Sequence, residues 1–206
     1  MTGSHDLPRT SEVVIVGGGV MGASSAYALA SRGVQVTLVE RDGIAVGASG
    51  RNAGIYSTSS LYASGLTPYL AASRHIFSRW PEELEADFSF RHTGSLMLET
   101  DPDAPARLRR EYAHQGGAAS GPRVLDGDEA RCLVPALSPL VTAAVYHTDN
   151  GHLWPFALNH ALAGAAVKHG ARIVLETEVT GIALAAGRVS GVETTRGRIA
   201  CRWVVN

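Results

Sequence analysis

The chain has 206 residues, of which 45% are hydrophobic and 18% charged, and 18 basic against 19 acidic side chains give a net charge of −1. This size fits one globular domain with part of a second, and the composition excludes a disordered chain. The basic residues are scattered, so we expect no nucleic-acid partner. The uncharged stretch 13–31 is interrupted by glycines and serines, so we expect no transmembrane segment, no signal peptide and a cytoplasmic protein.

The first predicted elements form one strand, helix, strand unit. Residues 1–10 are predicted to be a disordered terminus. The β-branched run 13–16 predicts a strand buried on both faces of a parallel sheet, residues 20–30 have helical spacing, and 34–39 predict a second strand. About 30 residues is the length expected of a βαβ crossover.

Further elements follow along the chain. Helices are predicted over 67–84, where Pro81 ends or kinks the helix, and over 101–117, 126–133 and 155–169; strands are predicted over 94–99, 172–175, 179–184, 189–194 and 199–205.

A glycine motif joins the first strand to the first helix. Gly17-x-Gly19-x-x-Gly22 is followed by Glu40 at the end of the next strand. The first glycine allows a tight turn, the second lets the backbone approach a pyrophosphate, and the third lets the helix pack closely on the strand. A carboxylate at Glu40 accepts hydrogen bonds from a ribose and disfavours a 2′-phosphate. The motif predicts dinucleotide binding; the alternative is a glycine-rich turn with a coincidental glutamate.

Small residues surround one hydroxyl, one guanidinium and one amide in the segment Gly-Ala-Ser-Gly-Arg-Asn-Ala-Gly at 47–54. Such a segment can pass close to a flat ring and a pyrophosphate while it offers backbone and side-chain donors. A nicotinamide-dependent dehydrogenase, a weaker interpretation of the glycine motif, has no obvious use for it.

Three segments, 13–22, 40–41 and 47–54, together resemble the FAD-binding amino terminus of the D-amino-acid oxidase superfamily. Residues 90–96, 149–155 and 178–182 are similar to later segments of that family, so the resemblance covers 12–206. It implies an α/β (α+β overall) fold, in which a Rossmann-like FAD-binding βαβ domain is joined to part of an antiparallel-sheet substrate domain. The implied division is 11–88 for the FAD-binding part, 89–160 for the substrate domain and 161–206 for the return to the FAD-binding domain.

The resemblance also implies a set of FAD-binding residues. It implies that Ser49 lies on the pyrophosphate side, that Arg51 and Asn52 shape the surroundings of the flavin, and that the backbone at Val179 meets the adenine. The alternative for Arg51 is a solvated loop arginine, and the alternative for Val179 is a plain buried strand valine. The full set is Gly17, Gly19, Val20, Met21, Gly22, Glu40, Arg41, Gly47, Ala48, Ser49, Arg51, Asn52, Ala53, Gly54, Ile55 and Val179.

The implied activity is oxidation of the C–N bond of an amino acid or secondary amine by hydride transfer to FAD, which gives an imine. In the family, the residues that hold the substrate carboxylate lie beyond the part matched here, so no catalytic residue is carried over. We therefore expect a second polypeptide that completes the fold and covers an otherwise unpaired sheet edge. The alternative is a non-catalytic dinucleotide-binding subunit for assembly or electron relay.

Other chemistry has weak support in the sequence. The histidines lack metal-ligand spacing and neither cysteine has another nearby, so we expect no metal site. Cys132 and Cys201 are interpreted as reduced thiols, with a single bridge as the alternative. No histidine or cysteine falls between Gly43 and Arg74, which excludes covalent flavin attachment from that segment.

Overall fold

The computed structural model describes residues 6–57, 67–113 and 122–206. Part of the expected disordered terminus (1–5) and the end of the helix expected over 101–117 (114–117) lie outside the described residues. The chain divides into two compact units. Unit 1 contains Met1–Gly54, Arg79–Phe88 and Trp154–Asn206, and unit 2 contains Ile55–Ser78 and Ser89–Leu153. No helix in the described ranges is long and apolar enough to cross a bilayer.

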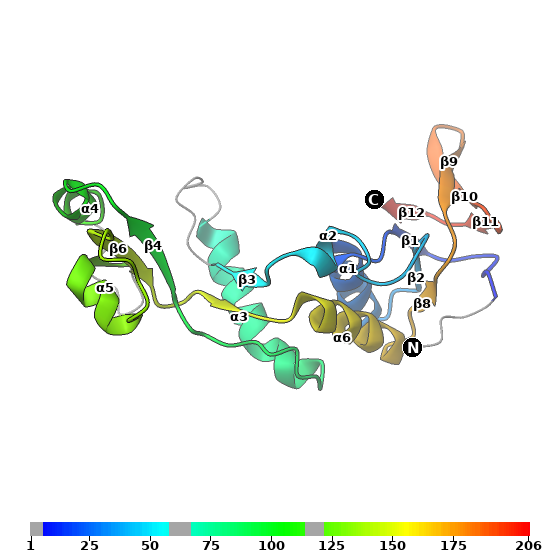
Figure 1. Cartoon of the computed structure of the whole chain (residues 1–206). Coiled ribbons are helices and arrows are strands. Elements are labelled where there is room, and N and C mark those ends of the chain that lie inside the picture. Colours follow the sequence, from blue (N-terminus) through cyan, green and yellow to red (C-terminus); the bar gives the residue numbers. More distant parts are fainter. Residues whose placement is uncertain (1–5, 58–66, 114–121) are drawn as a thin grey trace. The chain divides into compact units, whose positions relative to one another are not determined.

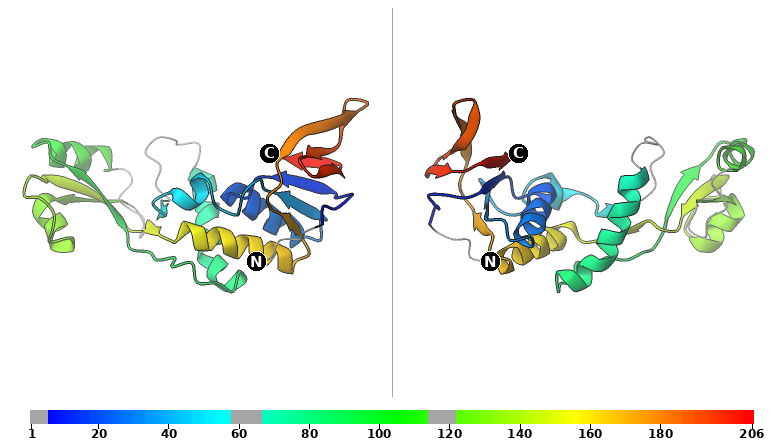
Figure 2. Two further views of the ribbon diagram at one scale, coloured as in Figure 1. Left: turned by 45° about the vertical axis from the view of Figure 1, so that its right-hand side comes forward. Right: turned by 180° about the vertical axis from the view of Figure 1, so that it is seen from behind.

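Unit 1 is built on a parallel sheet. Its strand order is β12-β1-β2-β8, and all three pairs are parallel. The strands are β1 (Val13–Val16), β2 (Val36–Val39), β8 (Arg172–Val174) and β12 (Trp203–Val205), and the helices are α1 (Val20–Ala30) and α6 (Pro155–Lys168). The two helices lie side by side in every view (Figures 1 and 2). The predicted βαβ unit and the parallel sheet are therefore confirmed.

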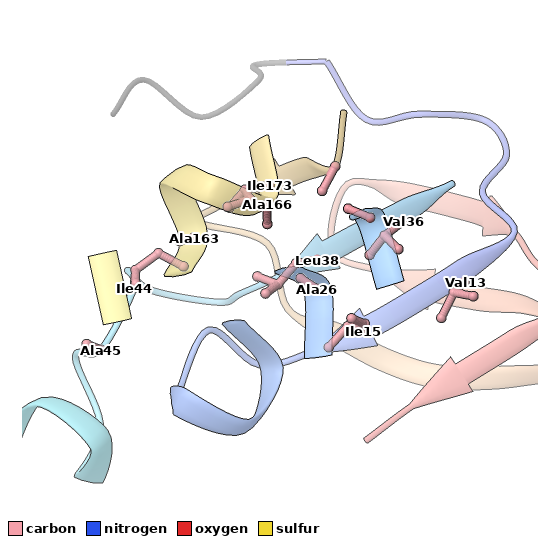
Figure 3. Packing of buried hydrophobic residues seen from close by; sticks show 12 residues of the cluster. Val13, Ile15, Ala26, Val36, Leu38, Ile44, Ala45, Ala163, Ala166 and Ile173 are labelled. Carbon is pink, nitrogen blue, oxygen red and sulfur yellow. The ribbon is translucent and has the colours of Figure 1, made fainter. Parts of the chain in front are cut away.

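The alternation of side chains along β1 and β2 explains why both strands are buried on both faces. Val13 and Ile15 point toward the helices, where they pack with Ala26 of α1 and Ala163 of α6 (Figure 3). Val14 points to the opposite face, which is covered by an antiparallel sheet of β9 (Val179–Ala185), β10 (Arg188–Thr194) and β11 (Gly197–Ala200). The all-apolar run of β1 is the sequence pattern typical of a strand that is covered on both faces.

The single strand predicted over 199–205 is wrong. The structure has two strands there, because β11 pairs antiparallel with β10 whereas β12 pairs parallel with β1. Between them, Arg202 and Trp203 donate their backbone N–H groups to the Glu12 carbonyl, at 3.1 and 3.2 Å. The apolar alternation continues through this change of partner, so periodicity alone could not locate the break.

Unit 2 contains an antiparallel sheet of order β4-β6-β5, formed by β4 (Ser95–Glu99), β6 (Ala143–His147) and β5 (Arg123–Asp126). Helix α4 (Ala104–Glu111) packs on the face of β6 that carries Ala143 and Val145, and α5 (Gly127–Leu133) packs on the face that carries Ala144. The strands β5 and β6 were not predicted. Alanines dominate the start of β6 because helices cover both of its faces, and alanine carries little strand signal.

The remaining elements of unit 2 include a short antiparallel pair, β3 (Ile55–Tyr56) with β7 (Gly151–His152). Helix α3 (Thr67–Glu83) passes from unit 2 into unit 1 and continues through Pro81. A proline in the last turn removes only its own N–H bond, and Leu84 still donates to the Trp80 carbonyl at 2.8 Å. The helix therefore continues past Pro81, where the sequence predicts an end or a kink, and ends at Glu83 within the predicted range 67–84.

Candidate functional site

The turn between β1 and α1 has the geometry that its glycines predict. Gly17 has a φ of +104°, a conformation that side chains other than glycine rarely adopt. A Cβ atom on Gly22 would meet the Gly17 carbonyl oxygen well inside 3.0 Å, a separation that real Cβ atoms essentially never show. The first turn of α1 therefore packs directly on the backbone of the turn, and its free N–H groups lie at the end of β1.

Glu40 extends from the end of β2 to this turn. Its Oε2 accepts a hydrogen bond from the Gly18 N–H at 2.5 Å and its Oε1 accepts one from the Asp42 N–H at 2.9 Å. The backbone of Glu40 is held as well, since its N–H donates to the Val174 carbonyl and its carbonyl accepts from Thr177. An ionised carboxylate has about four lone-pair sites, so two remain for a ligand.

Ser49 connects the segment 47–54 to α1. The segment forms a short helix, α2 (Ala48–Arg51), that was not predicted. The Ser49 Oγ accepts a hydrogen bond from the Val20 N–H at 3.0 Å. Gly19, the residue before α1, has no side chain to cap the helix. Ser49 therefore satisfies one of the free N–H groups of α1 from 29 positions away.

Asn52 organises the end of the same segment. Its Nδ2 donates to the Ser49 carbonyl at 2.9 Å and to the Ala48 carbonyl at 3.3 Å, and its Oδ1 accepts from the Gly54 N–H at 2.8 Å. One amide side chain thus closes α2 and sets the direction of the chain toward Gly54.

A pocket of about 180 Å³ lies beside these groups. Six predicted site residues line it together: Gly19, Glu40, Arg41, Gly47, Ala48 and Ser49. The pocket is also lined by residues that were not predicted, namely Gly18, Asp42, Gly43, Ala45 and Val46. Backbone donors, a helix amino terminus and the Glu40 carboxylate therefore converge on one concave surface, the arrangement that binds a pyrophosphate joined to a ribose.

The other predicted residues lie outside the pocket lining. Met21 is 77% exposed and Arg51 is exposed at the end of α2. Val179 packs against the apolar cluster of Val14 and Val39 on the sheet face opposite the helices. Ile55, which is 72% exposed, belongs to unit 2. Gly17, Val20, Gly22 and Gly54 make the backbone contacts described above, Asn52 makes its contacts through its side-chain amide, and Ala53 lies between Asn52 and Gly54.

Two polar residues near the site were missed. Thr177 is buried and donates its N–H to the Glu40 carbonyl at 3.0 Å. Asn159 of α6 is buried and its Nδ2 lies 3.5 Å from the Ser49 carbonyl oxygen. The available signal for Asn159 was one amide among the apolar positions Leu158, Leu162 and Ala163 of a helix.

The described part of the chain contains no cluster of side chains arranged for metal binding or for thiol chemistry. It contains no group of three or more histidine, cysteine, aspartate or glutamate side chains that could hold a metal ion. Cys132 is exposed and Cys201 is buried, and both are free thiols. Burial raises the pKa of the Cys201 thiol, which keeps it protonated.

Fold and site together define a Rossmann-like dinucleotide-binding protein. The chain belongs to the family of FAD-dependent oxidoreductases whose model matches residues 12–206. The cofactor of this family is FAD, as the sequence predicts, which leaves the nicotinamide alternative without support.

Named relatives agree with this assignment. The chain is 32% identical over 189 residues to the anaerobic glycerol-3-phosphate dehydrogenase subunit A1 of Haloferax volcanii, covering 92% of this chain and 32% of that protein. It is 30% identical over 202 residues to the mitochondrial pyruvate dehydrogenase phosphatase regulatory subunit of Mus musculus, covering 97% of this chain and 23% of that protein. Among solved structures, glycine oxidase from Bacillus cereus is similar with a TM-score of 0.84 at 32% identity, covering 95% of this chain and 54% of that one. The chain thus spans about a third or less of these curated relatives and about half of this solved one.

Proposed function

We propose that this chain is the FAD-binding half of an oxidoreductase that oxidises the C–N bond of an amino acid or secondary amine to an imine. The observation that carries the proposal is the pocket in which the α1 amino terminus, Glu40 and Ser49 meet. When bound, the flavin would accept the hydride that leaves the substrate carbon.

The residues of the pocket fit the polar parts of FAD. The Gly19 amide and the amino terminus of α1 would approach the pyrophosphate, which is attracted by the positive end of the α1 dipole. Glu40 would accept hydrogen bonds from the adenosine ribose and is held for this by its contacts with Gly18 and Asp42. Ser49 would lie on the pyrophosphate side, with its hydroxyl free to donate while its oxygen accepts from Val20.

Positions beyond the pocket complete the proposed cofactor site. Arg51 and Asn52 would lie toward the flavin, and the backbone at Val179 would meet the adenine. In support of the last assignment, Thr177 anchors the start of β9 to the Glu40 backbone.

A second polypeptide carrying the remainder of the fold is the partner that we propose. Strand β12 lies at the edge of the parallel sheet. Its Trp203 side chain is 61% exposed and Val205 is also exposed. An unpaired strand edge with apolar side chains is the surface to which a further strand adds.

Two other functions have specific support among the relatives. Similarity to a glycerol-3-phosphate dehydrogenase subunit favours oxidation of an alcohol carbon beside a phosphate. Similarity to a phosphatase regulatory subunit favours a non-catalytic dinucleotide-binding role.

One experiment separates these functions. The purified protein is examined by visible absorption and by the intact mass of every polypeptide in it, and then mixed without oxygen with amino acids, secondary amines and glycerol 3-phosphate in turn. Loss of the flavin colour with an amine or amino acid supports the proposal. Loss of colour with glycerol 3-phosphate alone overturns the amine assignment. Bound flavin that no substrate reduces favours the non-catalytic role when the intact masses show that a second polypeptide is present. A colourless protein that takes up no added FAD would refute cofactor binding itself.

A further inference from the structure

A carboxamide is buried in the apolar face of α6. Asn159 is only 1% exposed, and Leu158, Leu162 and Ala163 on the same helix are buried as well. Burying an amide costs free energy unless its donors and acceptor are all paired. In the described part of the chain the Oδ1 atom of Asn159 has no hydrogen-bond partner. Packing alone would favour an apolar side chain here.

The helix itself does not need this amide. The Nδ2 atom donates to the Pro155 carbonyl at 2.8 Å. Pro155 is four residues earlier, so its carbonyl is the one that the backbone N–H of residue 159 uses in a regular helix. The bond to Pro155 is therefore an addition to the helix, and the contact that reaches outside α6 is the one between Nδ2 and the Ser49 carbonyl, at 3.5 Å.

The Ser49 carbonyl is a junction between elements of the candidate site. It accepts from the Nδ2 of Asn52 as well as from that of Asn159. On the other side of the same residue, the Ser49 hydroxyl accepts from Val20 at the start of α1. A series of hydrogen bonds thus connects Asn159 of α6, through Ser49 of α2, to Val20 at the amino terminus of α1.

We infer that Asn159 is a positioning residue for the FAD site. Its Nδ2 holds α2 against α6, and this fixes Ser49 over the first turn of α1. The identification of FAD as the ligand rests on the proposed function. The fixing of α2 does not, because it is a property of the protein without cofactor.

The test replaces Asn159 with two apolar residues of different volume, in Asn159→Leu and Asn159→Ala, within the whole chain. Hydrogen–deuterium exchange of the FAD-free protein is measured over residues 47–54, and FAD affinity is measured by titration of flavin fluorescence. The matched control is Leu158→Ala, which truncates the neighbouring buried residue and leaves the amide intact.

Both Asn159 variants should exchange faster over residues 47–54 and should bind FAD about three- to fivefold more weakly, the factor that corresponds to one long hydrogen bond in the lower to middle part of its net range. The Leu158→Ala control should lower the melting temperature while exchange over 47–54 and FAD affinity stay within about twofold of the parent. The inference is overturned if both Asn159 variants match the parent in exchange and affinity, or if Leu158→Ala reproduces their effects. Failure of the parent itself to bind FAD would instead refute the proposed function, and the exchange measurement would still decide the role of Asn159.

Discussion

Gly22→Ala gives a direct test of the close approach between α1 and the glycine turn. Two effects of opposite sign compete. Alanine is favoured over glycine in a helix by about 1 kcal/mol. The added Cβ, however, would overlap the Gly17 carbonyl oxygen, which is backbone and cannot rotate away. Overpacking of this kind costs about 1–3 kcal/mol. The net expectation is a destabilisation of up to about 2 kcal/mol, or up to about 8 °C in melting temperature for a chain of this size.

FAD binding should suffer more than stability does. The overlap is relieved only by moving the start of α1 away from the turn, and this displaces the N–H groups that would receive the pyrophosphate. Thermal unfolding and an FAD titration are measured in parallel. The control is Gly181→Ala in β9, where an added Cβ meets no atom within 4 Å. Unchanged stability and unchanged FAD affinity in Gly22→Ala would refute the close approach and, with it, the placement of the pyrophosphate at this turn.

Three further predictions concern single hydrogen bonds and one titration. Ser49→Ala removes the acceptor of the Val20 N–H, so the cofactor-free protein should lose about 1 kcal/mol in denaturant unfolding; an unchanged midpoint would contradict the capping role. Glu40→Gln places an amide donor among the N–H groups of Gly18 and its neighbours, so FAD affinity should fall about 10- to 100-fold by titration, and parental affinity would argue against ribose binding. Burial lowers the pKa of His147 below its usual value. As the pH falls, the unfolded chain therefore takes up a proton on this histidine before the folded chain does. The free energy of unfolding should fall as the pH drops from the ordinary histidine pKa toward the lowered one, and it should fall less in His147→Gln; identical pH profiles of melting temperature would exclude this effect.

The parallel sheet and its first crossover were predictable because their signals are local. The run 13–16, the glycines and the alternation of β2 all lie within 27 residues. The strand β6 was not predictable in the same way, since its alanines reflect helices packed on both faces. The break between β11 and β12 depends on which partner strand is near, and an apolar alternation is the same for either partner.

The candidate site was predictable where backbone geometry dictates residue type. Gly17 and Gly22 occupy positions that a side chain would strain, and Glu40 ends a strand beside them. Asn159 and Thr177 reach the same region only through the tertiary fold, at 110 positions from Ser49 in the case of Asn159. A lone polar residue in an apolar helix face shows that something is unusual, but it does not identify the group that it contacts.

The way unit 2 is inserted into unit 1 has a consequence for synthesis. The strands β1 and β2 leave the ribosome early, whereas α6, β8 and β12, which flank or cover them, all follow residue 154. The entropy lost on closing so long a connection grows only with the logarithm of its length, so the insertion is tolerated thermodynamically. The kinetics of folding are less favourable, because the apolar faces of the first two strands stay exposed while the intervening segment is translated. Helix α6 and strand β12 are thus the late-arriving parts of this unit, and a chain interrupted before residue 154 would present two bare valine-rich strands as a seed for aggregation.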